Sequence, residues 1–243
     1  MSFIEIEGIS KQFNNVRALD NICFDIDDGE VLGVGGESGS GKSTLARIIL
    51  GLISPSDGSI LINGKPLKEY GRELCKTAQI VFQDPQTSLN PKMSITDIIS
   101  EPLIIHKMVI GKRVEELLEL VKLPKSCRTR FPHELSGGER QRIGIARALA
   151  LNPRFLILDE PISSLDVTIQ VDILKLLKEL KKKLGLTYMF IAHDLMVLKY
   201  ISDRILIIKE GRMIELADKT QIFENPRHEY TRSLLAAIPR AYI

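Results

Sequence analysis

The stretch EVLGVGGESGSGKSTLARIIL, from Glu30 to Leu50, joins a short apolar run to a glycine-rich loop and then to an amphipathic segment. Residues 31–34 are apolar on both faces, which is typical of a buried central strand. Residues 36–43 fit the pattern G-x-x-x-x-G-K-[S/T], whose glycines let backbone N–H groups surround phosphate oxygens. A helix is predicted from about Lys42 to Leu50, ended by Gly51. The stretch therefore predicts a phosphate-binding loop, although a merely glycine-rich turn also fits the letters.

The parts of this loop have separate chemical roles toward a nucleotide. The helix N-terminus favours negative charge, Lys42 would reach the β- and γ-phosphates, and the Ser43 hydroxyl would bind Mg²⁺. The predicted nucleotide-binding residues of the loop are Gly36, Glu37, Ser38, Gly39, Ser40, Gly41, Lys42, Ser43 and Thr44. Such a loop needs a second set of groups that hold the metal and activate water.

The stretch FLILDEP, residues 155–161, is a buried strand that ends in two acids. Asp159 would hold Mg²⁺ through its water shell, and Glu160 would lie beside the γ-phosphate and polarise the attacking water. Adjacent carboxylates also occur at solvated strand ends, which is the alternative interpretation. Glu160 is the candidate catalytic base.

Composition excludes several classes of protein. The chain has 243 residues, of which 44% are hydrophobic and 26% charged, as in ordinary globular proteins. A net charge of +2 is too small to indicate nucleic acid as the main partner. No apolar run is long enough for a membrane span, and the start MSFIEIEG lacks the features of a signal peptide, so we expect a cytoplasmic chain.

Cysteine and histidine residues give no metal-site pattern. Cys23, Cys75 and Cys127 are scattered and lack C-x-x-C spacing, so reduced thiols are expected. The four histidines are equally dispersed, and we predict no structural metal.

Strand signals dominate the first eighty residues. FIEIEG and ICFDI have the β-branched and alternating character of strands, Asn63-Gly64 indicates a hairpin, and AQIVF indicates a further strand. Residues 84–135 have helical patterns instead, interrupted by Pro124 and Pro132. We interpret this segment as a helical subdomain inserted into an α/β core.

Alternation of helices and strands resumes after this insertion. A helix from Gly138 to Leu151 precedes FLILDE, and a long helix from residue 167 places Ile169, Ile173, Leu176 and Leu180 on one face before Gly185. The strands TYMFIAH and RILIIKEG and two short helices complete the chain. This order predicts an α/β fold with a mostly parallel sheet covered by helices.

A second stretch, LSGGERQRIGIARALA from Leu135 to Ala150, also has the features of a phosphate-binding helix start. With GESGSGKS and FLILDEP, it makes the chain resemble the ATP-binding subunit of an ATP-binding cassette (ABC) transporter over nearly its whole length. The resemblance implies a P-loop NTPase fold with an N-terminal antiparallel β subdomain and an inserted α-helical subdomain. It implies one domain, 1–243, with a core at about 1–83 and 152–243 and a helical subdomain at about 84–151.

In that family LSGGE is the signature motif, which binds the ATP held by a second subunit. The resemblance therefore assigns ATP contact to Leu135, Ser136, Gly137, Gly138 and Glu139. It also explains two phosphate-binding loops in one chain, because each ATP is shared between two subunits. The alternative interpretation is that Ser136 and Glu139 only cap the helix.

Four further residues each match one motif of the family. Gln83 in VFQDP matches the Q-loop glutamine that approaches Mg²⁺ and the attacking water, and His193 in IAHDL matches the switch histidine at the γ-phosphate. Asp166 in SSLD matches the D-loop aspartate, and Ser164 stands where alanine is common. Phe13 in SKQFNN stands where a tyrosine commonly stacks on adenine, so stacking is kept without the hydroxyl. A packed Phe at a strand end is the alternative for Phe13.

The stretches VFQDPQTSLNPKMSI, SSLDVTIQVDILKLL and NPRHEYTRSLLAAIP resemble the oligopeptide, dipeptide and nickel importer branch of the family. The resemblance implies an ATPase that energises import with ATP and Mg²⁺. Members of the peptide type commonly run longer at the C-terminus, so the end at Ile243 favours a metal chelate, and peptides stay open as cargo. An exporter ATPase, a soluble non-transport ABC ATPase and a non-hydrolysing module are the alternatives.

The implied assembly is a head-to-tail ATPase dimer with ATP at the interface. The second ATPase subunit is a different chain or a copy of this one, and two transmembrane permease subunits and, indirectly, an extracytoplasmic substrate-binding protein complete the complex. No nucleic acid is expected. The chain would lie peripherally at the cytoplasmic face of the membrane. The mixed apolar and polar stretch PKMSITDIISEPL, residues 91–103, is the predicted docking surface, and packing of the same residues in the core of the helical subdomain is the alternative.

Overall fold

The computed structural model describes residues 2–238 and divides into two compact units. Unit 1 comprises residues 1–74 and 187–243, and unit 2 comprises residues 75–186. The predicted division into a core and a helical subdomain stays a prediction.

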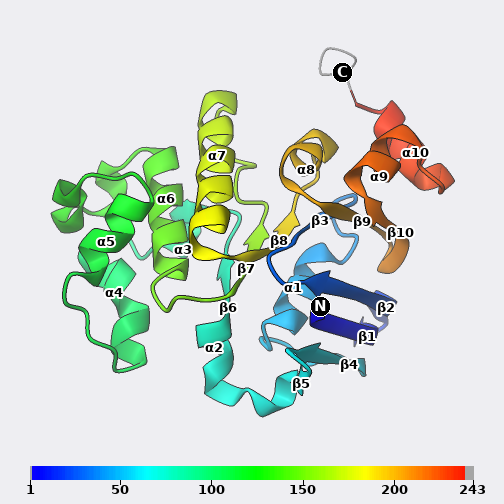
Figure 1. Cartoon of the computed structure of the whole chain (residues 1–243), viewed down its shortest axis with the longest axis horizontal. Coiled ribbons are helices and arrows are strands. Elements are labelled where there is room, and N and C mark those ends of the chain that lie inside the picture. The colour runs from blue at the N-terminus through cyan, green and yellow to red at the C-terminus, as the bar shows by residue number, and fades with distance from the viewer. Residues whose placement is uncertain (1, 239–243) are drawn as a thin grey trace. The chain divides into compact units, whose positions relative to one another are not determined.

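The first sheet of unit 1 is antiparallel, with strand order β2-β1-β4-β5 (Figure 1). Its strands are β1 (Ser2–Phe13), β2 (Val16–Asp27), β4 (Asp57–Ile62) and β5 (Lys65–Pro66). Asn63 and Gly64 both have positive φ, 50° and 71°, which is the conformation of a type I′ hairpin turn. The hairpin predicted there is confirmed.

The second sheet of unit 1 has the strand order β10-β9-β3-β8. Its strands are β3 (Val31–Gly35), β8 (Thr187–Ile191), β9 (Arg204–Lys209) and β10 (Arg212–Asp218). Strand β3 is parallel to β8 and β9, and all of its residues are buried, as its apolar sequence predicts. Only β10 is antiparallel.

Strand β10 is absent from the sequence prediction. Its one fully buried side chain is the charged Glu215, so the strand has none of the apolar alternation that identifies a half-buried strand. The missed signal is the turn at Glu210 and Gly211, which have positive φ of 49° and 76°. The helices of unit 1 are α1 (Lys42–Ile49), α8 (Leu195–Ile201), α9 (Lys219–Glu224), α10 (Glu229–Ala236), η1 (Leu67–Glu69) and η2 (Gly71–Glu73).

Unit 2 is mostly helical. It contains the parallel strands β6 (Ala78–Val81) and β7 (Phe155–Asp159). Its helices are α3 (Pro85–Ser88), α4 (Ile95–Ile105), α5 (Arg113–Leu120), η3 (Lys125–Thr129), η4 (Pro132–Glu134), α6 (Gly137–Ala148) and α7 (Val167–Leu184), and α2 (Leu74–Thr77) spans the boundary. The structure has no strand between residues 84 and 135, so the helical prediction for that described segment is confirmed.

The C-terminal end of α6 differs from the prediction, and that of α7 agrees with it. Helix α6 ends at Ala148 rather than Leu151, and the Arg113 guanidinium binds the carbonyl oxygen of Leu149 at 3.0 Å. Helix α7 ends as predicted at Gly185, which has a left-handed φ of 66°. Across residues 2–238, each helix is too short or too polar to cross a membrane.

Candidate functional site

The loop after β3 depends on glycine at two positions. A Cβ atom at Gly36 (φ 145°) would lie 2.1 Å from the Ile208 carbonyl oxygen. A Cβ atom at Gly41 (φ 106°) would lie 2.6 Å from the Ala18 carbonyl oxygen. Both positions need positive φ and direct contact with another backbone, so only glycine fits. The loop is therefore shaped by the neighbouring strands β2 and β9.

Lys42 lies along this loop and is only 5% exposed. Its Nζ donates hydrogen bonds to the carbonyl oxygens of Gly36 (2.8 Å) and Glu37 (2.7 Å). Gly41 is the N-cap of α1 and supplies no side-chain cap to the first helical amides. Amides without a side-chain cap, beside a buried cation, form a suitable site for phosphate.

His193 lies at the same edge of the sheet as the loop. Val34 of β3 pairs with Ile191 of the parallel strand β8, so Gly36 and His193 each follow that pair by two residues. The Ala192 backbone N–H donates to the Val34 carbonyl oxygen at 3.2 Å and holds the two chain ends together. The structure therefore places His193 beside the predicted phosphate-binding loop, on the exposed side.

Phe13 ends strand β1 and is 45% exposed, so its ring is not packed in the core. The Lys11 Nζ lies 5.0 Å from the ring centroid. The accessible ring contradicts the alternative that Phe13 is packed at the strand end. The stacking of Phe13 on adenine stays a prediction.

Gly211, in the β9–β10 turn, supports the loop and was not predicted. Its N–H donates to the Ser40 carbonyl oxygen at 3.0 Å, and its own carbonyl oxygen accepts from the Asp20 N–H at 2.8 Å. A Cβ atom there would lie 2.6 Å from the Ala18 carbonyl oxygen. The turn Glu210-Gly211 was the only sequence signal for this contact.

In unit 2, Gln83 and Glu160 come together. Val81 of β6 pairs with Leu158 of the parallel strand β7, and each of the two polar residues follows that pair by two positions. The Gln83 Nε2 donates to Glu160 Oε2 at 3.2 Å. A glutamine and a carboxylate 77 residues apart are thus brought into direct contact, with Asp159 at the end of the same strand.

Glu160 has an unusual backbone conformation for a non-glycine residue, with φ at 46°. Its carbonyl oxygen accepts hydrogen bonds from the Ser163 N–H (3.3 Å) and the Ser163 hydroxyl (3.2 Å). Strained backbone held by its surroundings is frequent at functional sites. The following turn leads to Asp166, the exposed N-cap residue of α7.

The start of α6 forms a complete capping box. The Ser136 hydroxyl accepts from the Glu139 N–H at 3.3 Å, and the Glu139 carboxylate accepts from the Ser136 N–H at 2.8 Å. Hydrogen bonds to the carboxylate, first from the Ser136 backbone N–H and then from the Ser136 side chain, lower the pKa of Glu139 below its ordinary value. The helix cap that the sequence allowed as an alternative is therefore present, and Ser136 is exposed.

The two glycines of this motif differ in their surroundings. Gly138 is buried, and a Cβ atom there would lie 2.7 Å from Cγ2 of Ile169 on α7, whereas Gly137 is half-buried. Leu135 is buried at 5% exposure. Close packing of α6 on α7 thus requires Gly138, while Ser136 faces solvent.

The predicted docking stretch, residues 91–103, has a buried apolar face. Its apolar side chains Ile95, Ile98, Ile99 and Leu103 are buried in unit 2, because they form the inner face of α4. The exposed apolar side chains follow that stretch, at Ile104, Ile105 and Val109. The apolar side chains of the stretch thus pack the interior of unit 2, as the alternative interpretation expects, and a docking role for the exposed polar side chains of residues 91–103 stays a prediction.

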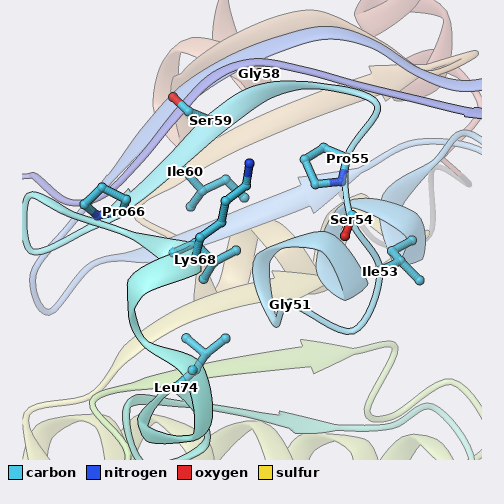
Figure 2. Close-up of a pocket in the computed structure, with 12 residues that line it drawn as sticks. Gly51, Ile53, Ser54, Pro55, Gly58, Ser59, Ile60, Pro66, Lys68 and Leu74 are labelled. Atoms are coloured by element: carbon cyan, nitrogen blue, oxygen red, sulfur yellow. The ribbon is translucent and has the colours of Figure 1, made fainter.

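Unit 1 also has a surface cavity of about 440 Å³, shown in Figure 2. Its apolar wall includes Ile53, Ile60 and Leu74, and Lys68 lies beside it. The residues of the loop at 36–43 are not among those that line it.

The loop at 36–43 and the acidic strand end at 159–160 are the parts of a P-loop nucleotide-binding protein. Comparison with known families agrees. Residues 19–163 match the family described as ABC transporter, and residues 214–242 match the oligopeptide/dipeptide transporter C-terminal region.

Similar proteins include the oligopeptide transport ATP-binding protein OppF of Bacillus subtilis, which is 51% identical over 97% of this chain and 82% of its own length. OppF of Streptococcus mutans is 48% identical over 97% of this chain and 81% of its own length. The chain therefore belongs to the ABC transporter family, as an ATP-binding and ATP-hydrolysing domain.

Solved structures agree on the fold. The cbiO1 protein of Clostridium perfringens, part of the ABC transporter complex cbiONQ, is 31% identical with a TM-score of 0.85 and covers 99% of this chain and 97% of its own. A dimeric ATP-binding cassette bound to ADP and Pi is 29% identical with a TM-score of 0.78 and covers 89% of this chain and 98% of its own. The fold is thus that of ABC ATPases, with a mostly parallel sheet, an antiparallel β sheet and helices.

Proposed function

We propose that this chain energises the import of oligopeptides. The observation that carries the proposal is the match of residues 214–242 to the oligopeptide/dipeptide transporter C-terminal region. The names of the similar proteins, oligopeptide transport ATP-binding proteins, support peptides over nickel or other metal chelates.

The proposed complex contains a second ATPase subunit, either a different chain or a copy of this one, and two transmembrane permeases. An extracytoplasmic binding protein would deliver peptide to the permeases, and this chain would lie peripherally on the cytoplasmic face. Ile104, Ile105 and Val109 are 58%, 69% and 89% exposed, and a cluster of this kind supports a contact with a permease.

We propose that the loop 36–44 binds the ATP phosphates through its amides and Lys42, and that Phe13 stacks on the adenine. Ser43, Gln83 and Asp159 would hold Mg²⁺, and their oxygen donors suit this hard cation. When bound, Mg²⁺ would neutralise charge on the phosphate oxygens.

We assign the role of catalytic base in hydrolysis to Glu160, and Gln83 and His193 would assist it. The Glu160 carboxylate would take a proton from the attacking water, and the Gln83 Nε2 hydrogen bond would orient that carboxylate. His193 would donate to the γ-phosphate, which the loop beside it holds.

We propose that the start of α6, residues 135–139, binds the ATP of the second subunit. Ser136 is exposed at the N-terminus of α6, and its hydroxyl and the backbone amides of the helix start would bind a phosphate oxygen. Asp166, exposed at the start of α7, would lie at the same dimer interface.

The test of the ATPase mechanism is Glu160→Gln. This variant should keep ATP affinity and lose turnover by about 10²- to 10⁴-fold, because a general base contributes that much. Light scattering with saturating ATP and Mg²⁺ should then show a dimer, or a dimer only after the second ATPase subunit is added. Near-normal hydrolysis would remove Glu160 from the base role.

The test of cargo is complementation of a bacterial strain that lacks its oligopeptide ATPase subunit. The chain, expressed with its own permeases, should restore growth of an auxotroph on a peptide that contains the required amino acid. Restored nickel uptake without peptide growth would contradict the peptide proposal.

A further inference from the structure

Phe13, the residue that we propose stacks on adenine, belongs to a hairpin that contacts the phosphate-binding loop. It pairs with Val16 across the turn that joins β1 to β2. Two residues further along β2, the Ala18 carbonyl oxygen lies so close to Gly41 of the loop that only glycine fits there. The hairpin and the loop thus form one continuous part of unit 1, and whatever holds the ring affects where a base can stack.

One face of the Phe13 ring is occupied by a cation from the same strand. The Lys11 Nζ lies over the ring, 5.0 Å from its centroid, which is within the range of a cation–π contact. The side chain of Phe13 is still 45% exposed. A base that stacks on this ring would therefore use the face opposite Lys11.

The Lys11 ammonium is held by the segment that follows α1, the helix of the phosphate-binding loop. Its Nζ donates to the Ser54 carbonyl oxygen at 2.7 Å. Ser56 fixes the same segment on β1, because its N–H donates to the Ser10 carbonyl oxygen at 2.8 Å and its hydroxyl accepts from the Gln12 N–H at 3.1 Å. These hydrogen bonds hold the cation in place over the ring.

A cation in this position changes what the ring offers to adenine. The faces of an aromatic ring are negative, so two rings that stack directly face to face repel each other. A cation over one face attracts this negative charge and makes the opposite face more favourable for a base. Phe13 also has no hydroxyl that could orient the ring through a hydrogen bond, so the contact with Lys11 is the polar interaction available to orient it.

We propose that Lys11 is a positioning residue of the ATP site: its ammonium covers one face of the Phe13 ring, orients the ring and leaves the opposite face for adenine. The proposal rests on the proposed stacking of Phe13. It assigns Lys11 a role in binding the base, through Phe13, and none in binding the phosphates.

The experiment is Lys11→Met in the full chain, which keeps the aliphatic stem and removes the charge. Calorimetry with ATP and with inorganic tripolyphosphate, each with Mg²⁺, compares a ligand that has the base with one that lacks it. ATP should bind about two- to fivefold more weakly, the range of an exposed cation–π contact, and tripolyphosphate should bind as in the wild type. Lys11→Arg keeps a cation over the ring and should bind ATP like the wild type.

Two controls make the result specific. Lys65→Met removes a cation that also lies 5.0 Å from a ring centroid, that of Tyr70, and should leave ATP affinity unchanged. Phe13→Ala should weaken ATP binding about tenfold, as for other bases stacked on aromatic side chains. In a double-mutant cycle, Lys11→Met combined with Phe13→Ala should bind ATP no more weakly than Phe13→Ala alone, because Lys11 acts through the ring.

The outcomes separate the two proposals. Wild-type ATP affinity in Lys11→Met, equal weakening of ATP and tripolyphosphate, the same loss in Lys11→Arg, or additive effects in the cycle would overturn the role of Lys11. Each of these leaves the stacking of Phe13 intact as long as Phe13→Ala weakens ATP binding. Wild-type ATP affinity in Phe13→Ala would instead overturn the proposed stacking itself, and the role of Lys11 with it.

Discussion

Helices α1 and α6 differ in how their first backbone N–H groups, which have no partner within the helix, are capped. Helix α1 begins after Gly41, whose hydrogen side chain supplies no cap, and its loop is shaped by contact with other strands. Helix α6 begins with Ser136, and Ser136 and Glu139 cap the helix reciprocally. The α1 start has no side-chain cap and is the start that we propose ATP completes, whereas the α6 start is complete in itself and has one exposed hydroxyl. We therefore expect the α1 start to determine the affinity of one chain for ATP, and the α6 start to matter when two chains meet.

The largest expected effect is that of Lys42→Ala. This change removes the buried cation that binds the loop carbonyls, and it should weaken ATP binding by the single chain about 100-fold. Equilibrium binding of a fluorescent ATP analogue measures the change. Lys65→Ala removes the same charge from beside Tyr70 and should leave affinity unchanged. Unchanged affinity in Lys42→Ala would contradict the role of the α1 start.

A smaller effect is expected from Gly41→Ala. The new Cβ atom would meet the Ala18 carbonyl oxygen at a left-handed φ, so the free energy of unfolding should fall by about 2 kcal/mol. Gly144→Ala in the middle of α6, where a Cβ atom meets nothing within 4 Å, should raise it by up to about 1 kcal/mol. Urea denaturation of both variants compares them, and equal effects would show that the loop is not shaped by its neighbours.

Ser136→Ala should lower the free energy of unfolding by about 1 kcal/mol, because it removes the cap of α6. ATP affinity of the single chain should stay unchanged, while ATP-dependent dimerisation should weaken. Ser94→Ala is the matched control, since Ser94 caps α4 in the same way. It should lower stability similarly and leave dimerisation intact. Equal loss of dimerisation in both variants would assign the effect to stability alone.

The smallest effect concerns the charge of Glu139, whose pKa the bonds from Ser136 lower in the folded state. A lowered folded-state pKa means that the carboxylate adds stability above its ordinary pKa of 4.5 and loses it as pH falls through the folded value. The contribution should be less than about 1 kcal/mol, as for other charges at helix starts. Urea melts of wild type and Glu139→Gln should therefore differ near neutral pH and converge in acid. A difference that grows in acid would contradict this sign.

The local elements could be predicted from sequence wherever apolar pattern and turn residues agree. Residues 31–34, the loop after them and the hairpin at Asn63 each depend on neighbours in the chain, and all formed as predicted. Strand β10 could not be predicted, because its buried residue is an ionised glutamate that binds the start of α10. For α4 the sequence left open whether its apolar side chains pack the core or dock a partner, since periodicity identifies a face without saying what covers it; in the structure they are buried.

The sequence by itself determined the glycine-rich loop, the acidic strand end and the family resemblance, because each depends on residues that are contiguous in the chain. Tertiary structure alone decided that Gln83 contacts Glu160 and that His193 lies beside Gly36, since parallel register brings together residues distant in sequence. It also decided that Ser136 caps its own helix. The reason is physical: hydrogen bonds and buried contacts depend on distance in space, and spacing along the chain fixes that distance only within a helix, a strand or a turn.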